Sequence, residues 1–185
     1  MKNEELHIVL MIGSIRKERS SHKPAQVIVK LLEDRGVLVE ILDLQELDLP
    51  VFDDGLDATG AEKLLEAYKK MDGMILVNPE YNHTISSSVK NAIDFARSKE
   101  LVNKPMTLVT TSMGGWGGLR SVYPVRQAWF GVGGQPMKPN LQTKDVTKFD
   151  VENPDENWLK AANRFVDDSL RWFRIIKAGS ALEQE

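Results

Sequence analysis

The stretch that most constrains the fold is residues 6–12 (LHIVLMI), a nearly continuous apolar run that is rich in branched side chains. Successive side chains of a β-strand point to opposite faces of its sheet, so a strand without polar alternation is buried on both faces. Such a strand lies inside a parallel sheet that helices cover on each side. The sequence therefore predicts an α/β domain in which this run is a central strand.

Four further apolar runs follow along the chain, and stretches with helical periodicity lie between them. We predict strands at residues 6–12, 37–42, 73–77 and 105–110, with a short, weak strand within 131–139. We predict helices at residues 24–35, 61–71, 85–97, 119–130 and 155–177. We expect residues 43–60 to be a polar connection, 140–154 to be irregular and 178–185 to be a frayed tail.

This alternation of strands and helices implies a parallel sheet with right-handed crossovers. For five strands we expect the flavodoxin-like order 2-1-3-4-5, in a three-layer sandwich that forms a single domain over residues 1–185. The order of the strands then reverses between strands 1 and 3, and ligands of such sheets bind at that point, beyond the carboxyl ends of the strands. The loops after these strands are therefore the first places to look for a site.

The composition excludes several kinds of partner. The net charge of −3 gives no general attraction to nucleic acid or to anionic membranes. The chain has no cysteine, which excludes disulfides and thiolate metal sites and fits a reducing cytoplasm. No apolar run approaches the ~20 residues of a membrane span. We expect a cytoplasmic protein without a metal site and without a nucleic-acid or membrane partner.

The loop after the first strand has the chemistry of a phosphate site. Residues 13–22 (GSIRKERSSH) supply hydroxyl and guanidinium groups from Ser14, Arg16, Arg19, Ser20 and Ser21. The helix that follows offers free N–H groups and a partial positive charge. The loop lacks the Gly-Lys-Ser/Thr ending of a Walker A loop and the G-x-G-x-x-G dinucleotide motif, so a monophosphate fits better. Alternatively, a serine only caps the helix and the arginines are solvated.

Two further loops at the same edge of the sheet suit a flat ligand. Residues 78–83 (NPEYNH) follow the third strand and offer the Tyr81 ring, polar side chains and backbone amides. Residues 111–118 (TSMGGWGG) combine glycines, which let the backbone approach a ligand closely, with Trp116. A phosphate end, a ring end and a glycine loop together match flavin mononucleotide (FMN). The simpler alternatives are a polar turn at the first of these loops and a surface or subunit-interface tryptophan at the second.

These motifs resemble the NAD(P)H-dependent FMN reductase family, which includes quinone, azo-dye and chromate reductases. The resemblance rests on GSIR with the arginine and serines after it, on PEYN followed by VKNAIDFA, and on the Gly-Gly loop. It covers about residues 8–130 and in outline the whole chain, and the PEYN and KNAID segments are its most specific part. It implies a flavodoxin-like fold, FMN as cofactor, NADPH or NADH as electron donor, and a homodimer or homotetramer with FMN near a subunit interface.

The resemblance also implies a role for particular residues. The FMN phosphate would be held by Ser14, Arg16, Arg19, Ser20 and Ser21. The isoalloxazine ring would be lined, largely through backbone amides, by Pro79, Glu80, Tyr81 and Asn82, with His83 beside them. The other side of the ring would contact Ser112, Gly114 and Gly115. Apart from the resemblance, the large ring of Trp116 makes it a further candidate to cover the flavin.

The chain departs from the family pattern before the third helix. Residues 85–88 (ISSS) stand where the family often has Pro-Gly, and this would alter how the nicotinamide or the acceptor reaches the ring. No family role maps onto Trp116 or Arg120. Arg120 would either meet a phosphate of the nicotinamide nucleotide or be a solvated charge of its helix.

The expected reaction is hydride transfer from NAD(P)H to FMN, followed by reduction of a quinone, free flavin, azo compound or metal oxyanion. Backbone N–H groups can stabilise the charge of the reduced ring, so we assign no catalytic acid or base. His83 is a candidate proton source by location, or else a hydrogen-bond partner. Glu80 is expected to act through its backbone, because its carboxylate would repel an anionic reduced flavin.

Other functions remain compatible with these motifs. A flavodoxin-type electron carrier would bind FMN and turn over NAD(P)H slowly. A non-enzymatic flavin-binding redox sensor would bind FMN without turnover. A receiver-type signalling domain needs an acidic cluster after the first strand, and it is excluded because this loop is basic.

Overall fold

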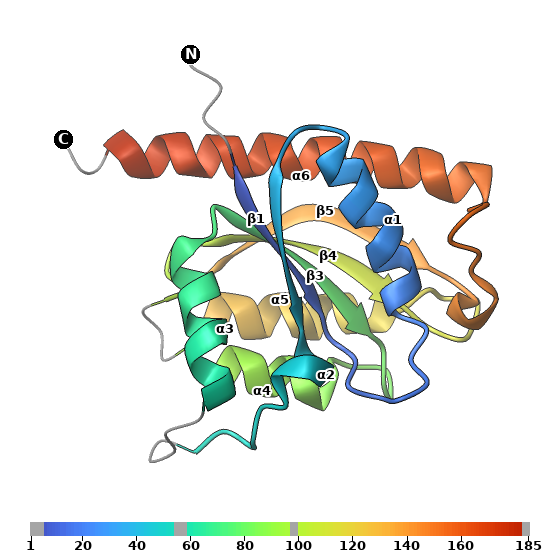
Figure 1. Cartoon of the computed structure of the whole chain (residues 1–185), viewed down its shortest axis with the longest axis horizontal. Coiled ribbons are helices and arrows are strands. Elements are labelled where there is room, and N and C mark those ends of the chain that lie inside the picture. Colours follow the sequence, from blue (N-terminus) through green and yellow to red (C-terminus); the bar gives the residue numbers. More distant parts are fainter. Residues whose placement is uncertain (1–5, 54–58, 97–99, 183–185) are drawn as a thin grey trace.

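The computed structural model describes residues 6–53, 59–96 and 100–182. Its sheet has five strands in the order β2-β1-β3-β4-β5, which confirms the predicted topology. The strands are β1 (His7–Ile12), β2 (Leu38–Asp43), β3 (Gly73–Pro79), β4 (Pro105–Thr111) and β5 (Gln135–Thr143). Each strand is parallel to its neighbours, so all five carboxyl ends lie at one edge, where the arrowheads point in Figure 1.

Helices cover both faces of this sheet, as Figure 1 shows: α1 and α6 lie on one face and α3, α4 and α5 on the other. Their bounds are α1 (His22–Glu33), α2 (Leu44–Leu47), α3 (Thr59–Lys70), α4 (Ser87–Asp94), α5 (Val122–Gly131) and α6 (Glu156–Leu182). Two 3-10 turns are η1 (Leu119–Ser121) and η2 (Val146–Lys148). The result is the three-layer arrangement that the buried first strand implies.

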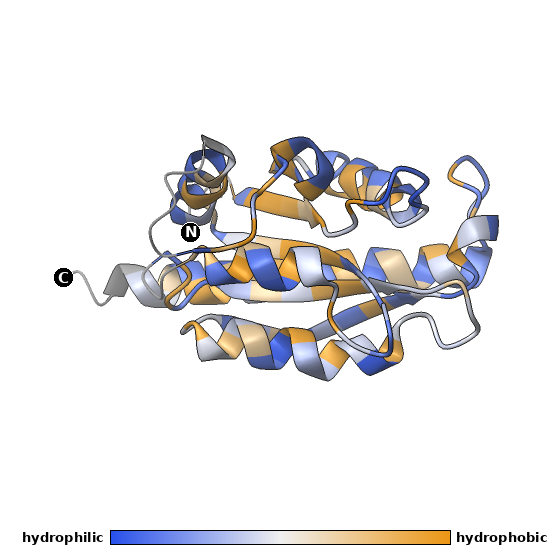
Figure 2. Cartoon of the chain, turned by 90° about the horizontal axis from the view of Figure 1, so that it is seen from below, coloured by the Kyte–Doolittle hydropathy of each residue, from blue (hydrophilic) through white to orange (hydrophobic). Residues whose placement is uncertain are grey.

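The alternation of side chains along β1 divides the core in two. Val9 and Met11 pack with α3, α4 and α5, whereas Ile8 and Leu10 pack with α1 and α6. All four are at most 1% exposed, and each such side chain contributes about 1.5–3 kcal/mol by leaving water. In Figure 2 the helices alternate between hydrophilic and hydrophobic colours while the strands are mostly hydrophobic. A strand with this sequence fits the inside of the sheet and neither of its edges.

Most elements begin or end one to three residues from the predicted boundaries, and clearer differences occur at β5, α2, α4 and the end of α6. β5 runs to Thr143, so the first part of the segment predicted to be irregular is an edge strand. Its polar residues and two prolines weaken the local signal, and pairing with β4 decides the structure. The connection at 43–60 contains α2, which begins where the Asp43 side chain accepts a hydrogen bond from the Gln45 amide.

The helix predicted at 85–97 is shorter, since α4 spans Ser87–Asp94, and residue 97 lies outside the described residues. The predicted tail at 178–185 is wrong for residues 178–182, because α6 continues to Leu182. Gly179 in that last turn costs a helix only about 1 kcal/mol, which does not end it. Residues 183–185 lie outside the described ranges.

Candidate functional site

The loop between β1 and α1 is fixed to the neighbouring helix at its first residue. The Gly13 carbonyl accepts hydrogen bonds from Ser88 Oγ at 2.5 Å and Ser86 Oγ at 3.3 Å, and its amide donates to the Val77 carbonyl at 2.9 Å. A Cβ atom at Gly13 would lie 2.4 Å from Cγ2 of Val89, so a larger residue does not fit. The β1–α1 loop therefore starts in direct contact with the beginning of α4.

The serines that replace Pro-Gly before α4 have a structural role in this contact. Ser86 is the N-cap of α4, and its Oγ accepts a hydrogen bond from the Val89 amide. The Ser86 amide in turn donates to Oδ1 of the fully buried Asn78 at 3.2 Å. Ser86 and Ser88, in the segment that stands where the family often has Pro-Gly, thus connect the ends of β1 and β3 through the start of α4.

Arg19 is held inside the β1–α1 loop by an ion pair with Asp43, at the end of β2. Its Nη1 donates to Asp43 Oδ1 at 2.7 Å and to the Ser14 carbonyl at 2.9 Å, while Nη2 pairs with Asp43 Oδ2. The two side chains are 12% and 9% exposed. The charge of Arg19, predicted as a phosphate ligand, is already balanced by a protein carboxylate.

A cavity of about 130 Å³ opens where the loops after β1, β3, β4 and β5 meet. The sequence predicted nine of its lining residues: Ser14, Arg16, Arg19, Ser20, Ser21, Pro79, Glu80, Tyr81 and Ser112. It missed five others: Glu18, Thr111, Met113, Val146 and Thr147. The last two come from the segment after β5, which had no recognisable motif, although the strand order places that segment at the same edge of the sheet.

The polar groups of this cavity form a donor set that suits an anion. Ser21 occupies the N-cap position of α1 and is 3% exposed, yet its Oγ has no hydrogen-bond partner among the described residues. The guanidinium of Arg16 lies 6.0 Å from the centre of the Tyr81 ring, at the rim of the same cavity. A buried hydroxyl without a partner, a helix N-terminus and an exposed guanidinium together fit a phosphate group.

A hydrogen bond joins the phosphate end to the ring end. Ser14 Oγ lies 2.8 Å from the Tyr81 hydroxyl, and Ser14 is 1% exposed. Beyond Tyr81 the chain makes a tight turn in which the Thr84 amide donates to the Tyr81 carbonyl at 3.0 Å. Asn82 and His83 occupy its centre with φ angles of +48° and +65°, and both residues are exposed. Their amides have no acceptor within the described ranges and remain free for a ligand.

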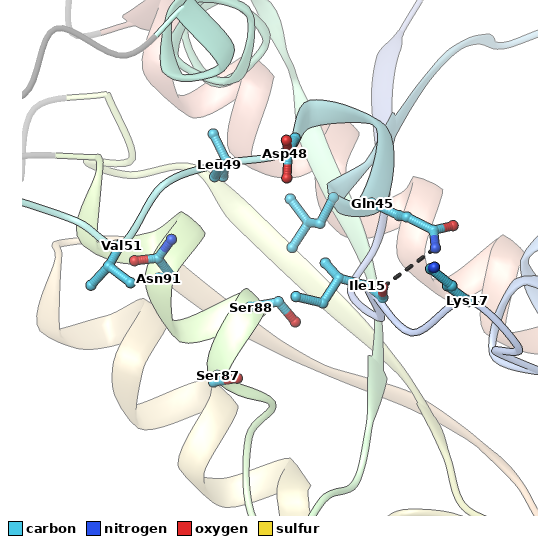
Figure 3. Close-up of a pocket in the computed structure, with 10 residues that line it drawn as sticks. Ile15, Lys17, Gln45, Asp48, Leu49, Val51, Ser87, Ser88 and Asn91 are labelled. Atoms are coloured by element: carbon cyan, nitrogen blue, oxygen red, sulfur yellow. Dashed lines mark hydrogen bonds between the residues drawn. The ribbon is translucent and has the colours of Figure 1, made fainter.

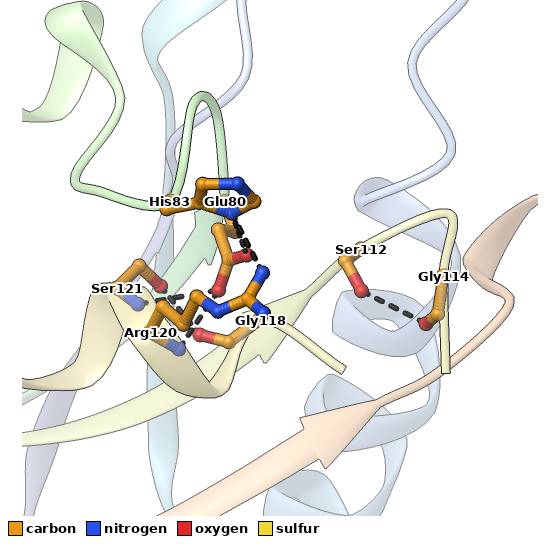
Figure 4. A network of polar contacts seen from close by, with 7 residues as sticks. All are labelled: Glu80, His83, Ser112, Gly114, Gly118, Arg120 and Ser121. Carbon is orange, nitrogen blue, oxygen red and sulfur yellow. Dashed lines mark hydrogen bonds and ion pairs between the residues drawn. The ribbon is translucent and has the colours of Figure 1, made fainter. Parts of the chain in front are cut away.

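Glu80 uses both its backbone and its side chain within the protein. Its amide donates to the Thr111 carbonyl at 2.9 Å, as part of the sheet. Its carboxylate accepts the amides of Arg120 at 2.9 Å and Ser121 at 3.3 Å, which caps η1 and α5 (Figure 4). The side chain is 7% exposed. Because its amide is already bonded in the sheet, the only backbone group that Glu80 can offer a ligand is its carbonyl.

The glycine loop after β4 lies beside this arrangement. Ser112 reaches the cavity, and its Oγ donates to the Gly114 carbonyl at 2.9 Å (Figure 4). Gly114, Gly115 and Trp116 lie outside the cavity lining, as do Asn82 and His83, and Trp116 is 61% exposed. Gly118 has a φ of +84°, and a Cβ atom there would lie 2.7 Å from the Thr110 Cβ. At least this glycine is required by the turn itself.

A second cavity of about 420 Å³ is drawn in Figure 3. Alternate residues of the β1–α1 loop line the two cavities, with Ile15 and Lys17 here and Ser14 and Arg16 at the smaller one. Its other walls come from α2, the segment after it and the start of α4: Leu44, Gln45, Asp48, Leu49, Val51, Ser87, Ser88 and Asn91. The sequence does not predict this cavity, because its lining is scattered over three segments.

Two negative findings apply to residues 6–53, 59–96 and 100–182. No group of three or more His, Asp or Glu side chains in these ranges is placed to hold a metal ion. None of the helices described there has the length and apolarity needed to cross a membrane.

A family model described as NADPH-dependent FMN reductase matches residues 6–145, which is most of the chain. The chain belongs to this family. As a member it is an oxidoreductase with a flavodoxin-like fold, and it works with FMN and NAD(P)H. The donor set around Ser21 and Arg16 is consistent with the phosphate of that cofactor.

Known proteins that resemble this chain are named as reductases or oxidoreductases. It is 33% identical over 135 residues to a quinone reductase of Escherichia coli K12, a match covering 68% of this chain and 70% of the relative. It is 28% identical over 130 residues to an NADPH azoreductase of Bacillus sp. OY1-2, with 69% and 70% covered. Its structure resembles FerB, a flavoenzyme NAD(P)H:(acceptor) oxidoreductase of Paracoccus denitrificans, with a TM-score of 0.78 and 26% identity over 91% and 97% of the two chains.

Proposed function

We propose that this enzyme binds FMN across the loops after β1, β3 and β4 and reduces a quinone-type acceptor with NAD(P)H. The observation that carries the proposal is the buried Ser21 hydroxyl, which lacks a partner among the described residues and lines a cavity rich in donors. In this reaction NAD(P)H supplies two electrons and one proton, and water supplies the second proton of the hydroquinone. When bound, FMN supplies the hydride and electron-transfer chemistry.

The residues divide the binding task by chemical type. Ser14, Arg16, Ser20 and Ser21 would hold the phosphate, whereas Arg19 keeps the loop in place through its ion pair. The ring would lie against Pro79, Tyr81 and Ser112, with the free amides of Asn82 and His83 as donors to it. Gly114, Gly115 and Trp116 would approach from the glycine loop. No side chain is required as an acid or base, since amides can stabilise the developing charge.

A quinone is favoured as acceptor because the relative at 33% identity is named a quinone reductase. An azo compound is the second candidate, on the strength of the azoreductase at 28% identity. Free flavin and metal oxyanions remain further acceptors to test. An electron carrier or a redox sensor would bind FMN in the same cavity without rapid turnover.

The test is reconstitution followed by turnover. Purified protein is loaded with FMN, and NADPH and NADH oxidation are followed with no acceptor, with a benzoquinone, with free FMN and with an azo dye. We expect a yellow protein whose NAD(P)H oxidation is fastest with the quinone. A protein that binds FMN and oxidises neither nucleotide would support the carrier or sensor function, and a protein that does not bind FMN would refute the proposal.

We also propose that the enzyme is a homodimer or homotetramer. Apolar side chains on η1 and α5 are unusually exposed: Leu119 at 39%, Tyr123 at 77% and Phe130 at 68%. Covering such a surface is favourable, and a second copy of the chain is the partner that the family resemblance implies. Light scattering on wild type and on Tyr123→Asp would test this, since the charge should shift the mass toward the monomer.

A further inference from the structure

Arg120 occupies a defined position beside the candidate flavin site, although the proposed function gives it no role. Its guanidinium lies over the Trp116 ring, with Cζ 5.5 Å from the ring centre, and Nη1 is 2.8 Å from Nδ1 of His83. Figure 4 shows the Arg120 side chain reaching from η1 toward His83 in the turn after β3. Arg120 is exposed and lies outside the lining of the small cavity. It therefore stands apart from the phosphate ligands around Ser21.

The Glu80 carboxylate lies near this guanidinium without pairing with it directly, because its Oε2 accepts the backbone amides of Arg120 and Ser121. Within residues 6–53, 59–96 and 100–182 the Arg120 side chain forms no ion pair, whereas Arg19 and Arg35 pair with aspartates. One N–H points at His83, and a guanidinium has five. Most of its donors are therefore available to an anion.

The contact with His83 orients the guanidinium. A guanidinium can only donate, so in this contact Nδ1 of His83 is the acceptor. Nδ1 also lies 3.5 Å from Glu80 Oε1, which is the longer of these two contacts. The cation of Arg120 is thus held in place by an aromatic face and a ring nitrogen.

We propose that Arg120 binds a phosphate group of the nicotinamide nucleotide and so helps the enzyme to recognise its electron donor. This inference rests on the proposed function. The guanidinium is held beside the exposed turn of Asn82 and His83, whose free amides are the proposed donors to the flavin ring. NADH carries a pyrophosphate and NADPH an additional 2′-phosphate, and guanidinium is the side chain best suited to bidentate contacts with phosphate. Arg16 and Arg120 would then serve two different anions.

The test compares Arg120→Ala with Arg120→Lys, and uses Arg171→Ala as a control at an exposed arginine of α6. Titration calorimetry measures binding of NADP⁺, NAD⁺ and 2′,5′-ADP to the FMN-loaded enzyme. Anaerobic stopped-flow experiments separate the dissociation constant of the reduced nucleotide from the limiting rate of flavin reduction. Arg120→Ala keeps the backbone amide that donates a hydrogen bond to Glu80, so FMN affinity should not change.

We expect Arg120→Ala to weaken nucleotide binding roughly 10- to 100-fold with little change in the limiting rate, because one charged hydrogen-bonding group is lost. Arg120→Lys should fall between wild type and alanine, and Arg171→Ala should match wild type. If Arg120→Ala loses affinity equally for NAD⁺ and NADP⁺, Arg120 contacts the pyrophosphate. If it loses affinity only for NADP⁺ and 2′,5′-ADP, Arg120 contacts the 2′-phosphate. Either result supports the inference.

Wild-type affinity in Arg120→Ala would overturn the inference and leave the proposed function intact. An equal loss of FMN affinity would also overturn it, because Arg120 would then act on the flavin loop. A wild-type enzyme that binds FMN but neither nucleotide would overturn this inference and the proposed function together.

Discussion

Replacing Arg16 and Arg19 separately by alanine should give two different phenotypes, although the two residues lie three positions apart in one loop. Arg19→Ala leaves Asp43, which is 9% exposed, without its ionic partner. Removing one member of a buried pair typically costs about 3–5 kcal/mol, because the remaining charge stays desolvated. With a urea m-value of about 2 kcal/mol/M, the unfolding midpoint of the apoprotein should fall by roughly 2 M.

Arg16→Ala should leave stability almost unchanged and weaken FMN binding. The side chain is exposed and makes no ion pair in the described part of the chain, so its loss should change the free energy of unfolding by less than about 0.5 kcal/mol. A lost charged hydrogen bond to the phosphate costs about 1.5–3 kcal/mol, or roughly 10- to 100-fold in affinity. Riboflavin lacks the phosphate and should bind wild type and Arg16→Ala equally.

The two variants control for each other in the same assays. Urea unfolding followed by circular dichroism measures stability, and quenching of flavin fluorescence measures the affinity for FMN and for riboflavin. If Arg19→Ala unfolded at the wild-type urea concentration, the ion pair would not stabilise the loop as the geometry indicates. If Arg16→Ala lost riboflavin affinity as strongly as FMN affinity, Arg16 would not act on the phosphate.

Three further changes test the framework of the site. Gly118→Ala should lower the free energy of unfolding in urea by about 1–3 kcal/mol, because φ is +84° at this position. The control Gly115→Ala adds a Cβ with no described atom within 4 Å, so it should change that free energy by less than about 0.5 kcal/mol. Ser86→Ala should cost about 0.5–2 kcal/mol through loss of the α4 cap, and the exposed Ser87→Ala should cost less. Burial raises the pKa of Tyr68, so the unfolded state loses its proton first and stability should fall above pH ~10; Tyr68→Phe should flatten that fall.

The sequence predicted the sheet because its central strands carry an unambiguous signal. The apolar runs that became β1, β3 and β4 are buried on both faces, so local composition and tertiary structure agree. β5 was predicted only in part, since an edge strand with half-exposed polar residues is defined by pairing with β4. The α2 turn was missed for a related reason: four residues are too few for a helical period to appear.

The candidate site was predictable as a set of loops and less so as a set of contacts. Parallel order alone brings the loops containing Ser14, Tyr81 and Ser112 to one edge, and the cavity includes all three. Which arginine is free depends on Asp43, which lies 24 positions from Arg19 and has no motif to mark it. Long-range pairs of this kind cannot be derived from local spacing, so the sequence predicted the same role, phosphate binding, for Arg16 and Arg19.

Two of the acidic groups at this edge of the sheet are already bonded within the protein, which favours anion binding there, whereas a third, Glu18, is exposed in the lining of the small cavity. Asp43 is neutralised by Arg19, and the carboxylate of Glu80 is occupied by two backbone amides. In the described part of the chain, the Ser21 hydroxyl and the amides of Asn82 and His83 have no protein partner, and the guanidinium of Arg120 has donors to spare beyond its bond to His83. A surface with a net charge of −3 overall thus presents, at one place, donors whose acceptors must come from outside. Phosphates of a flavin and of a nicotinamide nucleotide are acceptors of that kind, and they would occupy separate donors on either side of the Tyr81 loop.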